Sequence, residues 1–260
     1  MAFVPLSDLT TSDLFKNIRL IATDMDGTLT QKGKFTPALI QTFEDLTQVN
    51  IQVIIVTGRS AGWVSGLANY LPVVGAIAEN GGLFYSNDIE AAIALTPIPD
   101  YKAHRQQLAE IFQKLQLEFP QICESRDNVF RITDWTFDVQ GLSLNQIQKM
   151  SEICYNLGWG FTYSNVQCHI KPLNQDKANG LIQVLQKYFP KYTLEQVACV
   201  GDSPNDEALF HPNYPISVGV ANVLAYANQL KYHPAYITTS EEGEGFCELA
   251  REILRSVSAK

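Results

Sequence analysis

The stretch LIATDMDGTLT, residues 20–30, decides the expected fold because an apolar, strand-like run ends there at two aspartates and a glycine. Residues 19–24 are short, partly β-branched and apolar on both faces, which is typical of a strand in a parallel sheet covered on both sides. Asp24 and Asp26 follow so closely on one another that their negative charges repel. A bound cation would offset that repulsion.

The same kind of apolar run recurs along the chain and alternates with amphipathic segments. Further strands are predicted at residues 51–56, 73–79 and 196–202. Helices are predicted at residues 37–49, which open with a proline, and at residues 177–189. This alternation predicts the α/β class, with a Rossmann-like parallel sheet core and helices on both faces.

The middle of the chain has a different pattern, in which one helix is followed by two strands and the unit then repeats. The predicted helices carry apolar stripes at Leu108, Ile111, Phe112 and Leu115, and at Ile147, Met150, Cys154 and Leu157. The predicted strands are residues 128–133, 135–139, 159–164 and 166–172. We therefore expect an inserted α+β cap domain at residues 83–172, and a discontinuous catalytic core of residues 1–82 and 173–260.

Polar side chains follow four of the predicted core strands. They are Asp24, Thr57, Asn80 and Asp202. Since ligands in open α/β sheets bind beyond the carboxyl ends of the strands, these four side chains are expected to converge on one crevice. The nearby Asp206 adds another carboxylate, and such hard oxygen ligands are those that Mg²⁺ prefers.

The two aspartates of the first stretch suit a division of labour in phosphoryl transfer. An ionised Asp24 can attack phosphorus, while Asp26 can protonate the leaving oxygen and then deprotonate water. The charge on the transferring phosphoryl group needs positive groups and donors, for which Lys177, Thr57 and the backbone amides around Gly27 and Gly58 are candidates.

Each of these residues also has a purely structural interpretation. Asp24 and Asp26 could form a turn with the following glycine, and a helix beginning near Pro204 could be capped by Asp202, Asn205 or Asp206. Lys177 could be a solvated residue, although a cation in a first helical turn opposes the helix dipole.

Two further residues of the candidate site have equally weighted alternatives. Arg59 could contact phosphate or substrate, or could form a surface ion pair. Asn80 could face the ligand or serve a turn between strand and loop.

Four segments in this order resemble the signatures of the haloacid dehalogenase superfamily, most of whose members transfer phosphoryl groups through an aspartyl-phosphate. The segments are DMDGT (24–28), VTGRS (56–60), Lys177 in QDKANGL, and GDSPND (201–206). The resemblance covers about residues 19–82 and 172–257, and all four motifs are intact.

The resemblance implies a role for each matching position. Asp24 would be the nucleophile and Asp26 the acid/base, with Thr57 and Lys177 holding the phosphate. The metal would be bound by Asp24, by the backbone carbonyl of Asp26 and by Asp202, with Asp206 in support. Asn205 would orient the phosphoryl group or Lys177, and Gly58, Arg59 and Asn80 complete the candidate substrate-binding set.

The position of the insertion indicates which subgroup of the superfamily the chain resembles. Thr57 lies 33 residues after Asp24, but Lys177 lies 120 residues after Thr57, so the extra domain follows the second motif. This order is similar to the subgroup with a type IIB cap, which includes sugar-phosphate phosphatases, Cof-like phosphatases and phosphomannomutases. In that subgroup the cap reads the leaving group, and the residues suspected of doing so here are Arg131, Trp135, Asp138, His169 and Lys171.

The composition and net charge limit the kinds of partner that the chain is expected to bind. The 260 residues carry a net charge of −8 and no basic block, which argues against nucleic acid or an anionic membrane surface as a partner. The five cysteines are scattered and show no metal-binding spacing. No apolar run approaches the roughly 20 residues of a membrane span. We expect a cytoplasmic protein, and the sequence does not indicate an oligomeric state.

Three functions remain open at this point. The first is a magnesium-dependent phosphatase that acts on a small phosphorylated metabolite, with a sugar phosphate favoured by the resemblance. The second is a phosphomutase, which would depend on a bisphosphate activator. The third is a non-catalytic protein that binds a phosphorylated ligand, and the intact pair of Asp24 and Asp26 argues against it.

Overall fold

The computed structural model describes residues 3–8, 14–88 and 90–258. Within these residues, nine strands form one large sheet in the order β1-β12-β11-β10-β2-β3-β4-β5-β6. The strands are β1 (Val4–Pro5), β2 (Leu20–Thr23), β3 (Gln52–Val56), β4 (Gly75–Ala78), β5 (Leu83–Tyr85), β6 (Ile93–Ala94), β10 (Val197–Gly201), β11 (Ile216–Gly219) and β12 (Tyr236–Ile237). The pairs β4–β5 and β5–β6 are antiparallel and the others are parallel.

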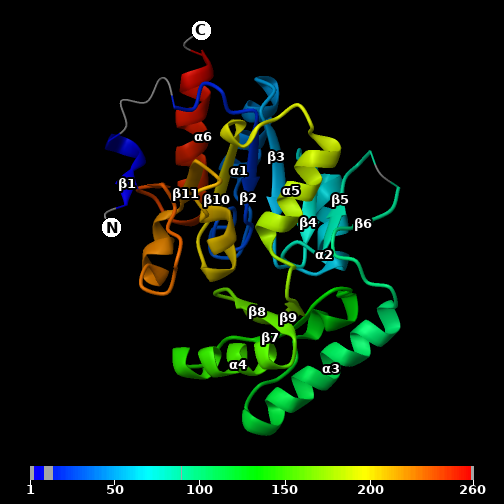
Figure 1. Cartoon of the computed structure of the whole chain (residues 1–260). Helices are drawn as coiled ribbons and strands as arrows, with labels where there is room; N and C mark the ends of the chain where they lie inside the picture. The colour runs from blue at the N-terminus through cyan, green and yellow to red at the C-terminus, as the bar shows by residue number, and fades with distance from the viewer. Residues whose placement is uncertain (1–2, 9–13, 89, 259–260) are drawn as a thin grey trace.

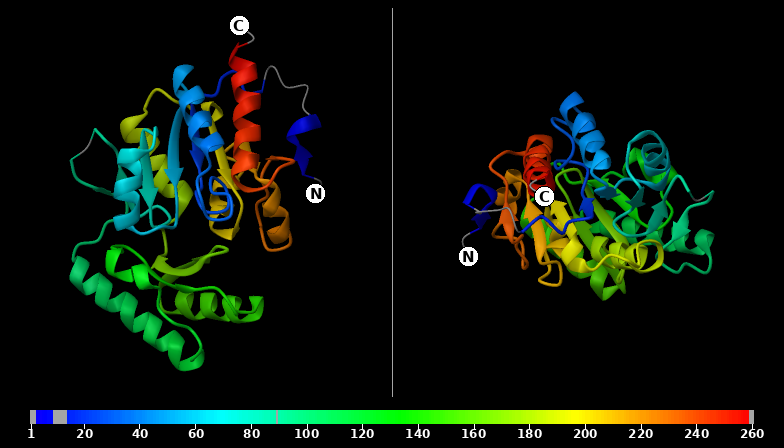
Figure 2. Two further views of the ribbon diagram at one scale, coloured as in Figure 1. Left: turned by 180° about the vertical axis from the view of Figure 1, so that it is seen from behind. Right: turned by 90° about the horizontal axis from the view of Figure 1, so that it is seen from above.

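Helices cover both faces of this sheet, as the sequence predicts (Figures 1 and 2). One face packs against α1 (Pro37–Gln48), α2 (Ala61–Tyr70) and α6 (Glu242–Ser258). The other face packs against α5 (Lys177–Tyr188). Ile21 lies in the first cluster while Leu20 and Ala22 lie in the second, because successive side chains of a strand point to opposite faces. The α/β class is therefore confirmed.

Residues 101–172 form a second, smaller body, here called the α3–β9 unit. It consists of α3 (Tyr101–Glu118), β7 (Trp135–Asp138), α4 (Leu144–Asn156), β8 (Trp159–Tyr163) and β9 (Gln167–Pro172). Its three strands form an antiparallel sheet in the order β7-β9-β8. Both helices pack on one face of that sheet, and the opposite face is turned toward the large sheet (Figure 1).

The predicted strand at residues 128–133 is wrong. A 3-10 helix, η2 (Arg126–Phe130), begins this segment instead. The side chain of Asn128 donates to the carbonyl of Thr136 at 2.8 Å and accepts from its backbone N–H at 2.9 Å. These are the two backbone groups that a neighbouring strand would use, so one side chain takes the place of the expected strand.

The boundary of the insertion also differs from the expected position near residue 83. β5 and β6 follow that residue, yet both hydrogen-bond into the large sheet. We propose that the inserted unit begins after β6, near residue 95, and ends near residue 172.

The remaining 3-10 helices are η1 (Leu6–Asp8), η3 (Leu194–Gln196), η4 (Pro204–Phe210) and η5 (Ala221–Tyr226). Of the helices that the structure describes, none combines the length and the apolar character needed to cross a membrane.

Candidate active site

The first predicted strand, β2, ends next to the expected position, and Asp24 therefore lies at the carboxyl end of the central strands. β2 stops at Thr23, and the backbone N–H of Asp24 donates to the carbonyl of Val200 on β10 at 2.9 Å. Thr57 directly follows β3, and Asp202 directly follows β10, the two strands that flank β2. The predicted convergence of strand ends is thus seen in the structure.

Lys177 links the nucleophile candidate to the second acidic motif. Its fully buried Nζ lies 2.5 Å from Oδ1 of Asp24 and 2.6 Å from Oδ1 of Asp206. Burial acts to lower the pKa of Lys177, but the carboxylates of Asp206 and Asp24 outweigh it and raise that pKa above its usual value. These two ion pairs explain why a cation begins helix α5 against the dipole.

Three carboxylates form a compact buried cluster. One oxygen each of Asp24, Asp202 and Asp206 lies within 4.8 Å of the others. Burial, opposed by Lys177, raises the pKa of Asp24 to about 7, and burial together with the charge on Asp24 raises the pKa of Asp202 well above its ordinary value. Negative charge held this closely favours a cation, so the donor set fits a hard divalent ion.

The oxygens of Asp206 are already engaged. Oδ1 accepts from Lys177, and Oδ2 accepts from the backbone N–H groups of Asp202 at 3.0 Å and Ser203 at 3.2 Å. Asp206 is therefore placed to orient the loop that carries Asp202. By contrast, Oδ2 of Asp24 has no hydrogen-bond donor among the described residues, since Lys177 bonds only Oδ1.

Asp26 does not join the carboxylate cluster through its side chain. Its Oδ2 accepts from Nε of Arg59 at 2.7 Å, and its Oδ1 accepts from Nη2 of Arg59 at 2.7 Å. Of the two alternatives for Arg59, the structure therefore shows an ion pair, although one that lies at the site. A two-bond pairing of this kind holds both side chains in a fixed orientation.

Gly27 and Asn80 occupy left-handed backbone positions that bring loops close to the site. Gly27 has φ +84°, and a Cβ there would lie 2.6 Å from Oδ2 of Asp202. Asn80 has φ +53°, and its Oδ1 accepts from Nδ2 of Asn205 at 3.1 Å. The Nδ2 of Asn80 is buried without a partner among the described residues. Asn80 thus serves the turn after β4, and its side chain bonds Asn205 of the GDSPND segment.

The α3–β9 unit closes over these strand ends and leaves a small cavity of about 10 Å³. From the large sheet it is lined by Asp24, Asp26, Thr57, Gly58, Arg59 and Asn205, and from β9 and the turn before it by Ser164, Val166, Gln167 and His169. This volume falls below the range of about 300–1,000 Å³ typical of sites for drug-sized ligands. It is close to the space that one water molecule occupies, so the polar lining, and not the volume, marks this cavity as the candidate site.

Of the five residues suspected of reading the leaving group, His169 lines this cavity. Arg131 lies behind it and donates to the carbonyl of Gly58 at 2.9 Å. Trp135 packs under Arg105 instead, and Lys171 donates to the carbonyl of Gln175. The fifth, Asp138, is exposed at the end of β7.

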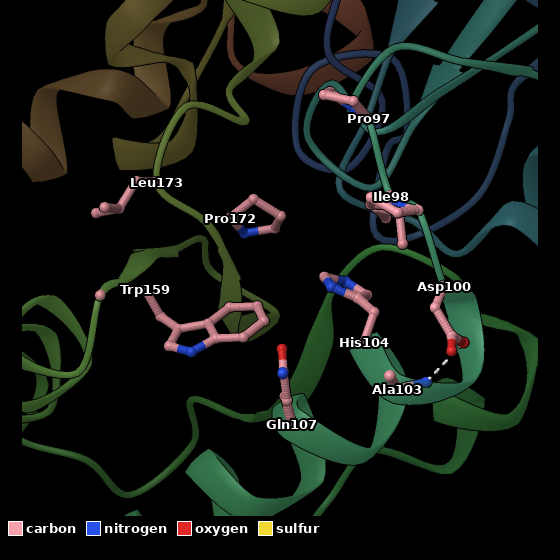
Figure 3. A pocket seen from close by; sticks show the side chains of 11 residues that line it. Pro97, Ile98, Asp100, Ala103, His104, Gln107, Trp159, Pro172 and Leu173 are labelled. Atoms are coloured by element: carbon pink, nitrogen blue, oxygen red, sulfur yellow. Dashed lines mark hydrogen bonds between the residues drawn. The ribbon is translucent and has the colours of Figure 1, made fainter.

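A larger cavity of about 390 Å³ lies elsewhere, beside the two chain segments that connect the bodies (Figure 3). Pro97, Ile98 and Pro172 contribute to its wall, and His104 and Trp159 approach each other there with ring centroids 5.4 Å apart. None of the strand-end residues lines it, so the polar convergence identifies the smaller cavity as the candidate active site.

Sequence reasoning missed three residues of the site's surroundings. Nδ2 of Asn222 donates to Oδ2 of Asp202 at 2.8 Å and to the carbonyl of Gly27 at 3.0 Å. Asn222 follows β11, so recognition of that strand would have indicated it. Asp134 and Glu79 lie in buried networks that are made by segments distant in sequence, and no local pattern marks them.

Glu79, which follows β4 of the large sheet, binds the loop between η2 and β7 in the α3–β9 unit. Its carboxylate accepts from the backbone N–H groups of Ala61, Ile132 and Thr133, and from the Thr133 hydroxyl. Burial, together with the charge on Asp134, raises the pKa of Glu79 from 4.5 to about 6, although the hydrogen bonds oppose the shift.

This raised pKa predicts a pH-dependent contribution to stability. The folded state holds the Glu79 proton more tightly, so the contribution is complete below about pH 4.5 and is lost as pH rises through about 6. Relative to Glu79→Gln, the wild type should lose roughly 2 kcal/mol of unfolding free energy across that window. Urea unfolding of both proteins at several pH values measures the difference. A difference that stays constant with pH would contradict the assignment.

The fold and the site together define an enzyme of the phosphoryl-transfer type with an α/β core, in which acidic groups and a threonine lie at adjacent strand ends and a lysine begins α5. The chain belongs to the haloacid dehalogenase-like hydrolase family, whose model matches residues 21–152. It falls in the Cof-like subgroup and is a phosphatase.

Two curated relatives and two solved structures illustrate this membership. The phosphoglycolate phosphatase of Staphylothermus marinus is 28% identical over 91% of this chain and 98% of its own length. That of Methanothrix thermoacetophila is 25% identical, over 89% and 95%. A crystal structure from Thermoplasma acidophilum gives a TM-score of 0.72 at 20% identity, covering 91% of this chain and 98% of that one. The C-terminal domain of C. albicans trehalose-6-phosphate phosphatase gives 0.68 at 16% identity, covering 99% and 98%.

Proposed function

We propose that this phosphatase is magnesium-dependent and hydrolyses a small phosphorylated metabolite through an aspartyl-phosphate on Asp24. The observation that carries the proposal is the state of that side chain. Asp24 is buried at the end of β2, Lys177 holds its Oδ1, and its Oδ2 is left without a donor among the residues described. A carboxylate oxygen fixed in this way is free to attack phosphorus.

The neighbouring residues supply the rest of the reaction. In the first step Oδ2 of Asp24 attacks phosphorus while Asp26 gives a proton to the leaving oxygen. In the second step Asp26 takes a proton from the water that attacks phosphorus, the bond between phosphorus and Oδ2 of Asp24 breaks, and phosphate leaves. Thr57, Lys177 and the backbone of Gly58 bind the phosphoryl oxygens. Arg59 holds Asp26 in position for both proton transfers.

Magnesium would be held by the carboxylates of Asp24 and Asp202 and by the backbone carbonyl of Asp26, with Asp206 fixing the Asp202 loop. The ion would supply positive charge against the phosphoryl oxygens. The buried carboxylate cluster, in which burial raises the pKa of Asp24 and that of Asp202, supports this assignment.

Removal of the metal should abolish turnover. With EDTA, phosphate release is expected to fall to background, and excess Mg²⁺ should restore it. Binding of Mg²⁺ to the folded state should also raise the thermal midpoint, because a ligand that binds only the folded state stabilises it. Full activity in EDTA, with no change in midpoint on adding Mg²⁺, would contradict the metal assignment.

Two classes of small substrate compete for the site. The subgroup resemblance favours a sugar phosphate, while the curated relatives are named for phosphoglycolate. Phosphate release from a panel containing both classes, with and without EDTA, tests the proposal. A phosphomutase would release little phosphate and would depend on a bisphosphate activator, so the same panel distinguishes it.

A further inference from the structure

His169 is the histidine of the active-site cavity. It lies on β9, where alternation places Cys168 and Ile170 against the helices and His169 on the opposite face. Its ring packs against the phosphate-binding loop so closely that a Cβ on Gly58 would lie 3.0 Å from Cε1. The ring is 2% exposed. It is therefore fixed at the junction between the α3–β9 unit and the large sheet.

A buried ion pair sets the tautomer of this ring. Nδ1 of His169 lies 2.8 Å from Oδ2 of Asp134, and both oxygens of Asp134 also accept from Nη1 of Arg131, at 2.9 and 3.0 Å. Arg131 compensates the charge on Asp134 and lowers the pKa of that carboxyl against the effect of burial. A carboxylate can only accept, so Nδ1 carries the hydrogen.

The other ring nitrogen is therefore an acceptor when the ring is neutral. Nε2 has no hydrogen-bond partner in the described part of the chain, and it is not one of the sealed, unpartnered polar atoms there. Burial lowers the pKa of His169, and Arg131 and Lys177 act in the same direction against Asp134. The ring thus presents a lone pair to the cavity.

Gln167, the other polar side chain of β9 at this cavity, is already engaged, and Ser164 Oγ in the preceding turn accepts from the backbone N–H of Val166 at 3.1 Å. Oε1 of Gln167 accepts from Nη2 of Arg131 at 2.9 Å, and its Nε2 donates to Asp127 at 3.2 Å. Arg59, which also lines the cavity, is held by two bonds to Asp26. A carboxylate on the leaving group would find this guanidinium already paired.

We propose that His169 is a specificity-determining residue whose Nε2 accepts a hydrogen bond from a hydroxyl group of the leaving group and disfavours a carboxylate at that position. This inference rests on the proposed phosphatase function. It favours the phosphate esters of polyols and sugars over phosphoglycolate. Asp134 and Arg131 act as positioning residues because they fix the tautomer and the orientation of the ring.

Three substrates of nearly equal size test the proposal, namely ethyl phosphate, 2-hydroxyethyl phosphate and phosphoglycolate. They place a methyl, a hydroxymethyl or a carboxylate group at the same point of the leaving group. In the wild type, kcat/KM for 2-hydroxyethyl phosphate should exceed that for each of the others by about tenfold. In His169→Ala both ratios should fall about tenfold relative to their wild-type values.

Two further variants sharpen the comparison. His169→Gln can keep an amide oxygen near the position of Nε2, so part of the preference for the hydroxyl substrate should return. His104→Ala removes another buried histidine of the α3–β9 unit, one that bonds the carbonyl of Thr133 and lies outside the active-site cavity. It should leave the substrate ratios unchanged.

The outcomes separate the two proposals. A folded wild type that hydrolyses none of the three esters would overturn the phosphatase function proposed at this site. A wild type that hydrolyses ethyl phosphate but prefers phosphoglycolate, or whose preference for the hydroxyl survives in His169→Ala, would overturn the role of His169 alone. Because the intrinsic reactivity of the leaving groups cancels only when a ratio is compared between variants, the change in each ratio from wild type to His169→Ala decides the outcome.

Discussion

Asp24→Asn is expected to reduce phosphate release by at least about 10⁴-fold, the scale seen when a covalent nucleophile is removed. The amide is nearly isosteric, and its oxygen can still accept the hydrogen bond from Lys177. It cannot attack phosphorus, and it brings no charge to a metal ion. The measurement is kcat for the best substrate of the panel, with folding checked by circular dichroism.

Asp138→Asn is the matched control, because it makes the same chemical change at an exposed carboxylate at the end of β7. Its kcat should equal that of the wild type. Rapid acid quenching should in addition trap a phosphorylated wild-type chain and none in Asp24→Asn. If Asp24→Asn retained more than a tenth of the wild-type rate, Asp24 would not be the nucleophile.

Lys177→Met should have the largest effect on stability. The substitution leaves the carboxylates of Asp24 and Asp206 buried without the cation that bonds both. Removal of one partner of a buried ion pair typically costs about 3–5 kcal/mol. Urea unfolding measures the loss, and phosphate release should fall to background because the phosphoryl group loses its lysine.

A second substitution tests the cause of that loss. Adding Asp206→Asn to Lys177→Met removes one of the stranded charges and should recover part of the unfolding free energy. Lys187→Met lies on the exposed part of the same helix and is the control, with an expected change of less than about 0.5 kcal/mol. Equal stability of Lys177→Met and wild type would show that the ion pairs contribute nothing net.

The core of the fold was predictable because its signals are local. β2, β3, β4 and β10 are short apolar runs, and α1 and α5 carry stripes of buried side chains, so each is visible in its own residues. The strand predicted at residues 128–133 does not form, and a side-chain contact that no local pattern indicates occupies its place. The side chain of Asn128 hydrogen-bonds the backbone of Thr136, and the β-propensity of residues 128–133 does not predict this contact.

The candidate site shows the same limit. Asp24, Thr57 and Asp202 were predicted because the carboxyl ends of parallel strands lie on the same side of the sheet. The buried group of Arg131, Asp134 and His169 joins two segments of the α3–β9 unit to the loop at Gly58. Taken singly, these residues look like ordinary strand and loop positions, and only the folded chain shows that they act together.

The turn between β8 and β9 limits the size of the substrates that we expect for this phosphatase. Asn165 in that turn comes so near the DMDGT loop that a Cβ on Gly27 would lie 3.0 Å from its Nδ2. The space left beneath the turn is about 10 Å³, close to what one water molecule occupies. A phosphoserine on a folded protein brings its own backbone with it, and that backbone has no room there. We therefore expect free metabolites, rather than phosphoserine on a folded protein, to be the substrates.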